Sequence, residues 1–161
     1  MATTKKTNYV KGVTPMPSPA GAEVVNVFAS MSLAAATDMD LADVWQFFTL
    51  PAGCVPVGYT VGATDMDTGT PAMTAHFGLL NAAADAVSTA AADGGAAWIT
   101  SLALSGTAAI TSNTASKAAY DILKAVTASS VDRIVGFVVA VIPATAAAGT
   151  VTVEFSYKAA N

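Results

Sequence analysis

The chain has 161 residues, of which 53% are hydrophobic and only 11% are charged, with a net charge of −4 and one cysteine, Cys54. One domain of this length buries about 68–70% of its unfolded surface and needs no disulfide, and a single cysteine excludes an intrachain disulfide or a cysteine-based zinc site. No Lys or Arg lies between Gly12 and Ser116, so this part cannot neutralise phosphates, which argues against nucleic acid as a partner.

The composition favours a β-rich protein that associates. Ala, Gly, Thr, Val and Ser dominate the sequence, as is typical of sheets and tight turns. Because only a few residues are charged, a monomer's surface would be poorly solvated. We therefore expect partner subunits to cover much of it. The N-terminal lysines precede no apolar stretch, and the most hydrophobic run, 134–142, ends at Pro143. We therefore expect a soluble protein made in the cytosol, without a membrane partner.

Residues 1–21 predict an extended N-terminal arm before one domain over residues 22–161. The prolines of this segment restrict the backbone, and few of its residues are apolar. Two interpretations stay open: a disordered tail, or a basic strap that orders only against an acidic neighbouring surface. The candidate contact residues of the strap are Lys5, Lys6, Tyr9, Lys11, Pro15, Pro17 and Pro19.

The next part of the chain alternates strands and turns. In residues 23–33, the side chains of Val25, Val27, Ala29, Met31 and Leu33 fall on one face, which predicts a half-buried strand. Residues 41–50, 54–61 and 72–80 have similar patterns, and Pro51-Ala52-Gly53 is a turn signal between two of them.

The second half continues the pattern with one ambiguous segment. Residues 81–95 are rich in Ala and are compatible with one helical turn, while 98–104, 131–142 and 150–157 predict strands. Residues 114–126 fit either a strand or a short helix, because Tyr120, Leu123 and Val126 share helical spacing and Asp121 can meet Lys124. Seven or eight short strands with turns between them predict an all-β antiparallel sandwich, jelly-roll-like.

The segment Thr-Asp-Met-Asp occurs twice, at 37–40 and at 64–67. Neither copy continues as an EF-hand loop: counted from Asp65, the required Gly and Glu are replaced by Thr70 and His76. Asp side chains accept hydrogen bonds from amides two residues further on, so turn chemistry is the favoured interpretation. A cation site at Asp38/Asp40 or at Asp65/Asp67, completed by carbonyl groups, stays open as an alternative.

The sequence offers no recognisable catalytic constellation. His76 is the only histidine and no Gly-x-Ser-x-Gly turn accompanies it, so we expect a strand histidine on a wet or interfacial face. Cys54 has no cationic neighbour and is interpreted as a small apolar residue. Gly94-Gly95 lacks the lysine of a phosphate loop. We predict no enzymatic activity, no cofactor and no metal.

Four stretches together resemble a known group of proteins. They are Phe48-Thr-Leu-Pro-Ala-Gly-Cys-Val-Pro-Val57, Asp65-Met-Asp-Thr-Gly-Thr-Pro-Ala-Met-Thr74, Phe77-Gly-Leu-Leu-Asn81 and Ala148-Gly-Thr-Val-Thr-Val-Glu-Phe-Ser-Tyr157. Over residues 22–158 the chain resembles small structural proteins encoded beside the capsid genes of tailed bacteriophages. The resemblance implies a head decoration, or cement, protein with a jelly-roll-like sandwich.

The resemblance also implies partners and a location. Such proteins assemble as homotrimers on the outer face of the virion's capsid, where they contact the major capsid protein and lock capsomers against internal pressure. On this hypothesis, deletion of residues 1–21 weakens attachment without unfolding the sandwich. One alternative is a carbohydrate-binding or adhesion module that stacks sugars on Trp45, Tyr59 or Trp98; another is a tail or fibre-base subunit.

Overall fold

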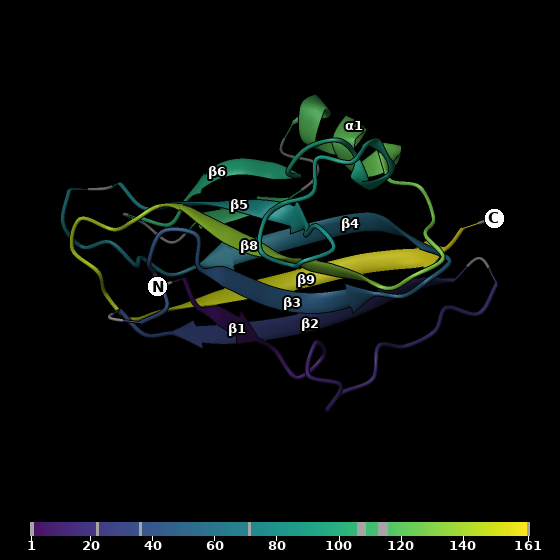
Figure 1. The fold of residues 1–161 in the computed structure, drawn as a ribbon, viewed down its shortest axis with the longest axis horizontal. Helices are drawn as coiled ribbons and strands as arrows, with labels where there is room; N and C mark the ends of the chain where they lie inside the picture. The colour runs from purple at the N-terminus through teal and green to yellow at the C-terminus, as the bar shows by residue number, and fades with distance from the viewer. Residues whose placement is uncertain are drawn as a thin grey trace.

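The computed structural model describes residues 2–160 except Ala22, Ala36, Pro71, 106–108 and 113–115. Nine strands, one 3₁₀ turn and one α-helix follow one another in this part of the chain (Figure 1). In chain order they are β1 (Thr4–Lys6), β2 (Val24–Leu33), β3 (Val44–Leu50), β4 (Cys54–Ala63), β5 (Thr74–Leu79), η1 (Ala91–Asp93), β6 (Ile99–Ala103), β7 (Ala109–Ser112), α1 (Lys117–Ala125), β8 (Arg133–Val141) and β9 (Gly149–Ala159).

The strands form two sheets. Sheet A has the order β1-β3-β8-β5-β6, and sheet B has the order β2-β9-β4-β7. Strands β2 to β9 pass between the sheets as the eight strands of a jelly roll do, with two Greek keys folded over one core. Strand β1 is additional to these eight strands. It pairs with β3 in parallel, whereas β2 with β9 and β3 with β8 form antiparallel ladders. The predicted all-β, jelly-roll-like sandwich is confirmed.

Strands β2 and β9 show how the sequence period becomes a sheet. Alternate residues of both strands are buried, among them Val27 and Met31 on β2 and Val153 and Phe155 on β9. Because successive side chains of a strand point to opposite faces, this period of two turns one face of sheet B towards sheet A. The ladder between β2 and β9 runs without a bulge from Val24–Lys158 to Leu33–Gly149.

Strand β3 departs from simple alternation because a bulge interrupts it. Its register with β8 shifts between Gln46 and Phe48, and both Phe47 and Phe48 are fully buried. A bulge places two residues opposite one, which lets consecutive side chains enter the core. The strand also begins at Val44 and not at residue 41, because Ala42 has a φ of 66°, a left-handed conformation outside the extended region.

Aromatic rings from both sheets fill the core. Trp98 stacks on Tyr59 with ring centroids 5.6 Å apart and on Phe155 at 5.9 Å, while Phe77 meets Phe137 at 4.5 Å. Trp45, Tyr59 and Trp98 are only 1%, 3% and 2% exposed. The three residues on which the adhesion alternative depends are therefore core residues, without an exposed face for a sugar.

The ambiguous segment 114–126 contains the helix α1, although residues 114 and 115 lie outside the described part. The hydroxyl of Ser116 caps it by accepting a hydrogen bond from the amide of Ala119 at 3.1 Å, and Leu123 is its buried residue. Asp121 pairs with Lys117 one turn earlier, not with Lys124 as expected. No described helix is both long and apolar enough to cross a membrane.

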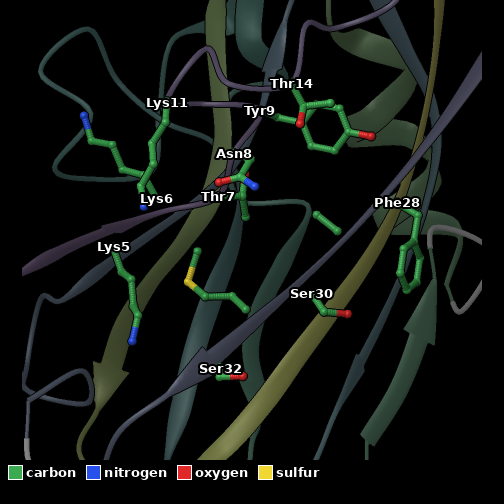
Figure 2. A pocket seen from close by; sticks show the side chains of 12 residues that line it. Lys5, Lys6, Thr7, Asn8, Tyr9, Lys11, Thr14, Phe28, Ser30 and Ser32 are labelled. Atoms are coloured by element: carbon green, nitrogen blue, oxygen red, sulfur yellow. The ribbon is translucent and has the colours of Figure 1, made fainter.

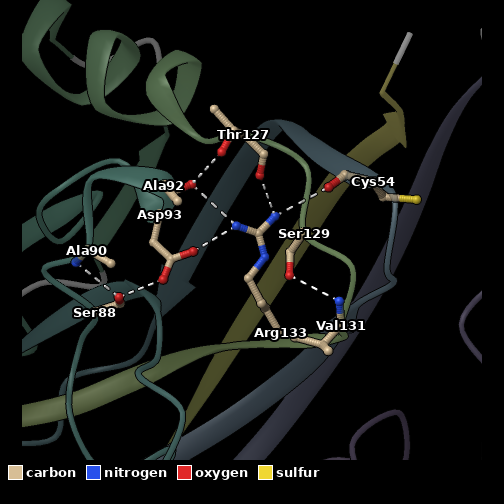
Figure 3. Close-up of polar contacts among 9 residues, drawn as sticks. All are labelled: Cys54, Ser88, Ala90, Ala92, Asp93, Thr127, Ser129, Val131 and Arg133. Atoms are coloured by element: carbon tan, nitrogen blue, oxygen red, sulfur yellow. Dashed lines mark hydrogen bonds and ion pairs between the residues drawn. The ribbon is translucent and has the colours of Figure 1, made fainter.

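A buried arginine joins the region around α1 to the sheets (Figure 3). Arg133, at the start of β8, makes an ion pair of 2.7 Å with Asp93 of η1, and the two side chains are 10% and 15% exposed. The same guanidinium donates to the carbonyl oxygens of Thr127, at 2.9 Å, and Cys54, at 3.4 Å. Asp93 also accepts from Ser88 at 2.6 Å. Arg133 therefore fixes the segment after α1, the 3₁₀ turn and β4 relative to one another.

Candidate interaction surface

The arm lies against its own sandwich. Its strand β1 adds to the outer edge of β3, with Thr4 opposite Val44 and Lys6 opposite Gln46. The amide of Thr7 continues the ladder by donating to the carbonyl of Gln46 at 3.0 Å, and the Thr7 hydroxyl donates to the carbonyl of Phe47. The first part of the arm is thus one more strand of sheet A.

Beyond β1 the arm is anchored to the core by side chains. The ring of Tyr9 lies 5.4 Å from that of Phe48, and Met16 packs against the same core. The hydroxyl of Tyr157, on β9, donates to the carbonyl of Pro17. Burial raises the pKa of Tyr157 to about 12, so this hydroxyl stays protonated. In the structure the arm contacts its own sandwich through isolated anchors such as Tyr9 and Met16, which leave no periodic signal in the sequence.

The predicted contact residues separate into anchored and free ones. Lys5 forms an ion pair with Asp38 and is partly buried, and Tyr9 is partly buried as well. Lys6 and Lys11 are exposed and make no ion pair within the described residues. Of the prolines, Pro15 and Pro17 are exposed, whereas Pro19 is partly buried. Whether these residues contact a capsid stays a prediction.

The first Thr-Asp-Met-Asp segment helps to hold the arm. Burial acts to raise the pKa of Asp38, but the amide of Ala34 and the ammonium of Lys5 outweigh it, so the pKa is lower than usual. Three residues after the segment, the buried carboxylate of Asp43 accepts hydrogen bonds from the amides of Asp40, at 2.8 Å, and Thr3, at 2.5 Å. The carboxylates of Asp38 and Asp43 thus both attach the arm to the sandwich.

The second segment joins two distant loops. Asp65 accepts from the amide of Asp67 at 3.0 Å, which is the predicted turn. The carboxylate of Asp67, 1% exposed, accepts from four further amides at 2.9 to 3.2 Å, those of Ala72, Met73, Ala144 and Thr145. The Thr145 amide and its companions outweigh burial and lower the pKa of Asp67 to about 2. Turn chemistry is confirmed here, and both oxygens of Asp67 are engaged by the backbone.

The other polar candidates have structural surroundings. Nδ1 of the partly buried His76 accepts from the amide of Ser101 at 3.1 Å. Cys54 is buried in the core, as expected of a small apolar residue, and burial followed by the charge of Asp132 raises its pKa. Within the described residues no group of three or more His, Cys, Asp or Glu side chains is placed to hold a metal ion.

A groove of about 480 Å³ opens between the arm and β2, where the outer strands of the two sheets face each other (Figure 2). We call it the open-side groove. Lysines of the arm border one side, and the second half of β2 borders the other. None of its 12 described lining residues is acidic. The lining residues used below are Lys5, Lys6, Lys11, Phe28, Ser30 and Ser32.

Sequence reasoning finds the lysines of this groove but misses what positions them. Asp43 is interpreted as one residue of a strand, although it ends a turn and binds the arm. An Asp three residues after another Asp, before an aromatic strand, is compatible with such a turn. The pairing of β1 with β3 has no comparable signal, because Thr-Lys-Lys shows no apolar alternation.

The same fold occurs in solved structures of phage capsids. A chain in the capsid of Ralstonia phage GP4 superimposes with a TM-score of 0.72, and the match covers 98% of this chain and 99% of that one at 23% identity. The fold is shared. A chain in the capsid of cyanophage Pam1 matches at a TM-score of 0.51 and 23% identity, over 91% and 94% of the two chains. No protein-family model and no curated protein matches this chain. The predicted resemblance to phage structural proteins is thus confirmed at the level of the fold.

Proposed function

We propose that the protein is a structural component of a phage virion that binds the outer surface of the capsid and stabilises contacts between capsomers. The observation that carries the proposal is the match to a chain in the Ralstonia phage GP4 capsid, which spans nearly the whole of both chains. The match therefore spans nearly the same length in both chains. We further propose that the protein acts without catalysis, as a homotrimer bound to the major capsid protein.

The free lysines and the apolar surface support a binding role. Lys6 and Lys11 project from an arm whose backbone is fixed to the sandwich, so their charges are held in place before a partner arrives. Preorganised groups lose less conformational entropy on binding. Phe28, Leu41 and Val131 are 62%, 62% and 65% exposed, and contact with other subunits would remove them from water.

The experiment is decoration of capsids in vitro. Heads formed from the major capsid protein of the same phage are mixed with the purified protein, separated by sedimentation and imaged by electron cryomicroscopy. We expect density on the outer surface and a higher temperature of head disruption than without the protein. The proposal would be contradicted if the purified protein bound neither expanded nor unexpanded heads.

The arm is tested by substitution, because the structure alters what deletion would do. Removing residues 1–21 would also uncover Phe48 and the edge of β3. The double substitution Lys6→Glu and Lys11→Glu leaves those contacts intact, and we expect it to weaken head binding at least tenfold. The matched control is Lys117→Glu with Lys124→Glu, which makes the same change in charge on α1.

A further inference from the structure

The geometry of β2 points to a strand-addition site: we propose that the open-side groove binds an extended, acidic segment of a partner protein, which pairs with the free edge of β2. The inference deepens the proposed function, on which it rests for the identity of the partner. It concerns β2 as an acceptor of a strand.

The first step is the direction of the backbone groups of β2. On β9, Thr150 directs its amide and its carbonyl to Thr64, at the end of β4, and therefore away from β2. The backbone N–H and C=O groups of even-numbered β9 residues consequently point towards β4, and those of odd-numbered residues form hydrogen bonds with β2. In the register of β2 with β9, odd residues face odd residues. The even residues of β2, among them Phe28 and Ser30, therefore point their N–H and C=O groups outwards.

Side-chain contacts support this assignment independently. Ser30 and Thr152 are partners in the register, and their hydroxyl oxygens are 2.8 Å apart. Asn26 and Ser156 are likewise partners, and their side chains are hydrogen bonded. In an antiparallel ladder the side chains are closer in the pairs that exchange no backbone hydrogen bonds. Both pairs are even-numbered, as the first step requires.

The second step is that β2 lacks the usual protection of an outer strand. Proteins shield exposed edges with charges, prolines, bulges or very short strands. Strand β2 has ten residues, VVNVFASMSL, with neither a charge nor a proline, and its ladder with β9 has no bulge. Within the described residues, no backbone hydrogen bond from another segment reaches its outer edge. A long unprotected edge of this kind fits pairing with another chain.

The third step is the charge of the occupant. Lys6 and Lys11, which make no ion pair within the described residues, border the groove together with Lys5, which pairs with Asp38, and no described acidic residue lines it. These are three of the seven basic residues of a chain that has eleven acidic ones. A segment with Glu or Asp at alternate positions would place carboxylates towards the lysines, while an apolar residue between them could cover Phe28, which is 62% exposed. A second copy pairing through β2 would instead bring two sets of lysines together.

The test uses the full chain and the acetylated, amidated peptide Glu-Val-Glu-Thr-Glu-Val, followed by amide NMR. We expect saturable shifts at Phe28, Ser30 and Ser32 and slower hydrogen exchange at these outward amides. A peptide with Lys for each Glu should bind at least tenfold more weakly. Lys6→Glu with Lys11→Glu should weaken binding of the acidic peptide at least tenfold, and the control Lys117→Glu with Lys124→Glu should change it less than twofold.

A backbone variant separates strand pairing from simple charge attraction. Ser30→Pro removes one outward amide, a change that outer strands tolerate, whereas Ser30→Ala keeps it. We expect Ser30→Pro to abolish peptide binding and Ser30→Ala to retain it. If the proline variant does not fold, strand pairing is tested instead by the lysine variants and by hydrogen exchange at the Phe28 and Ser32 amides. The inference would be overturned if both peptides bound equally well or if the NMR shifts lay outside β2 and the arm. It would also be overturned if two copies of the chain paired through β2. Heads that bind the protein while the acidic peptide does not would overturn the inference alone, and the reverse result would overturn the proposed function.

Discussion

At the scale of single residues, buried carboxylates organise the loops of this protein. Asp67 receives four amides from segments up to 78 residues away, and Asp43 receives the amide of Thr3. An ionised carboxylate that accepts several backbone hydrogen bonds is stabilised without a cation. In the first Thr-Asp-Met-Asp segment, Asp38 accepts from the amide of Ala34 and pairs with Lys5 of the arm. Both copies of the segment are therefore structural, although they hold different parts of the chain.

We expect Asp67→Asn to lower the unfolding temperature at pH 7. Asparagine keeps the size of the side chain, but its amino group cannot accept: it would face either the Thr145 amide or the three amides of Ala72, Met73 and Ala144. Because folding lowers the pKa of Asp67 from 3.8 to about 2, its ionisation stabilises the fold fully above about pH 4. This contribution is lost as the pH falls through 2, so the unfolding temperatures of the native chain and the variant should converge between pH 4 and 2.

The matched control for this prediction is Asp40→Asn, in the other copy of the segment. Asp40 is exposed, and the described contacts at this residue are made by its backbone. Thermal unfolding followed by circular dichroism should show little change. An Asp67→Asn protein as stable as the Asp40→Asn protein at pH 7 would contradict the role given to Asp67.

At the scale of elements, the strands with one buried face were predictable and the short ones were not. The two-residue period of β2 and β9 is visible because each buries every second side chain. Strand β1 has three residues and exists because the edge of β3 is available to it, which no local pattern encodes. The turn at Asp65 follows from local chemistry, but the amides of Ala144 and Thr145 reach Asp67 only through the β8–β9 connection. The lysines of the open-side groove were predictable. That β2 lines its other side was not, because this depends on β2 being the outer strand of sheet B.

The arrangement of elements around Arg133 gives a second prediction. Arg133→Ala would remove the donor to Oδ1 of Asp93 and to the carbonyls of Thr127 and Cys54, while Ser88 would still donate to Oδ2 of Asp93. Loss of one partner of a fully buried ion pair costs about 3–5 kcal/mol, and these two side chains are 10% and 15% exposed. We expect a loss of up to this size in the free energy of unfolding, measured with urea.

The exposed ion pair of α1 supplies the comparison. Lys117 and Asp121 are 86% and 56% exposed, so Lys117→Ala should cost about 0.5 kcal/mol or less. The double variant Arg133→Ala with Asp93→Ala should recover part of the loss, since it removes the stranded carboxylate. Equal effects of Arg133→Ala and Lys117→Ala would show that the buried arginine does not fix these elements.

At the scale of the whole molecule, surface composition and assembly belong together. The chain combines few charges with several exposed apolar side chains, among them Phe28, Leu41 and Val131. Contact with partner subunits would remove these side chains from water. The proposed trimer would cover some of them, and attachment to a capsid would cover more.

We therefore expect the purified protein to have a native mass of about three times 16.0 kDa. The measurement is light scattering after size exclusion, over a range of concentrations. A mass of three chains that stays constant on dilution indicates a preformed trimer, because symmetric assemblies with sizeable interfaces do not dissociate readily. The mass of one chain at every concentration would contradict it.

The pairing of β2 with β9 also determines when the protein can fold. These strands lie near opposite ends of the sequence, and β9 holds both β2 and β4 in sheet B. Sheet B therefore cannot close while β9 is still within the ribosome. Such distant pairing makes folding slow, because a long loop must be closed before its contacts form. Sheet B should therefore form only after β9 has left the ribosome, and a fragment that ends before Gly149 would expose β2 and β4 as aggregation-prone strands.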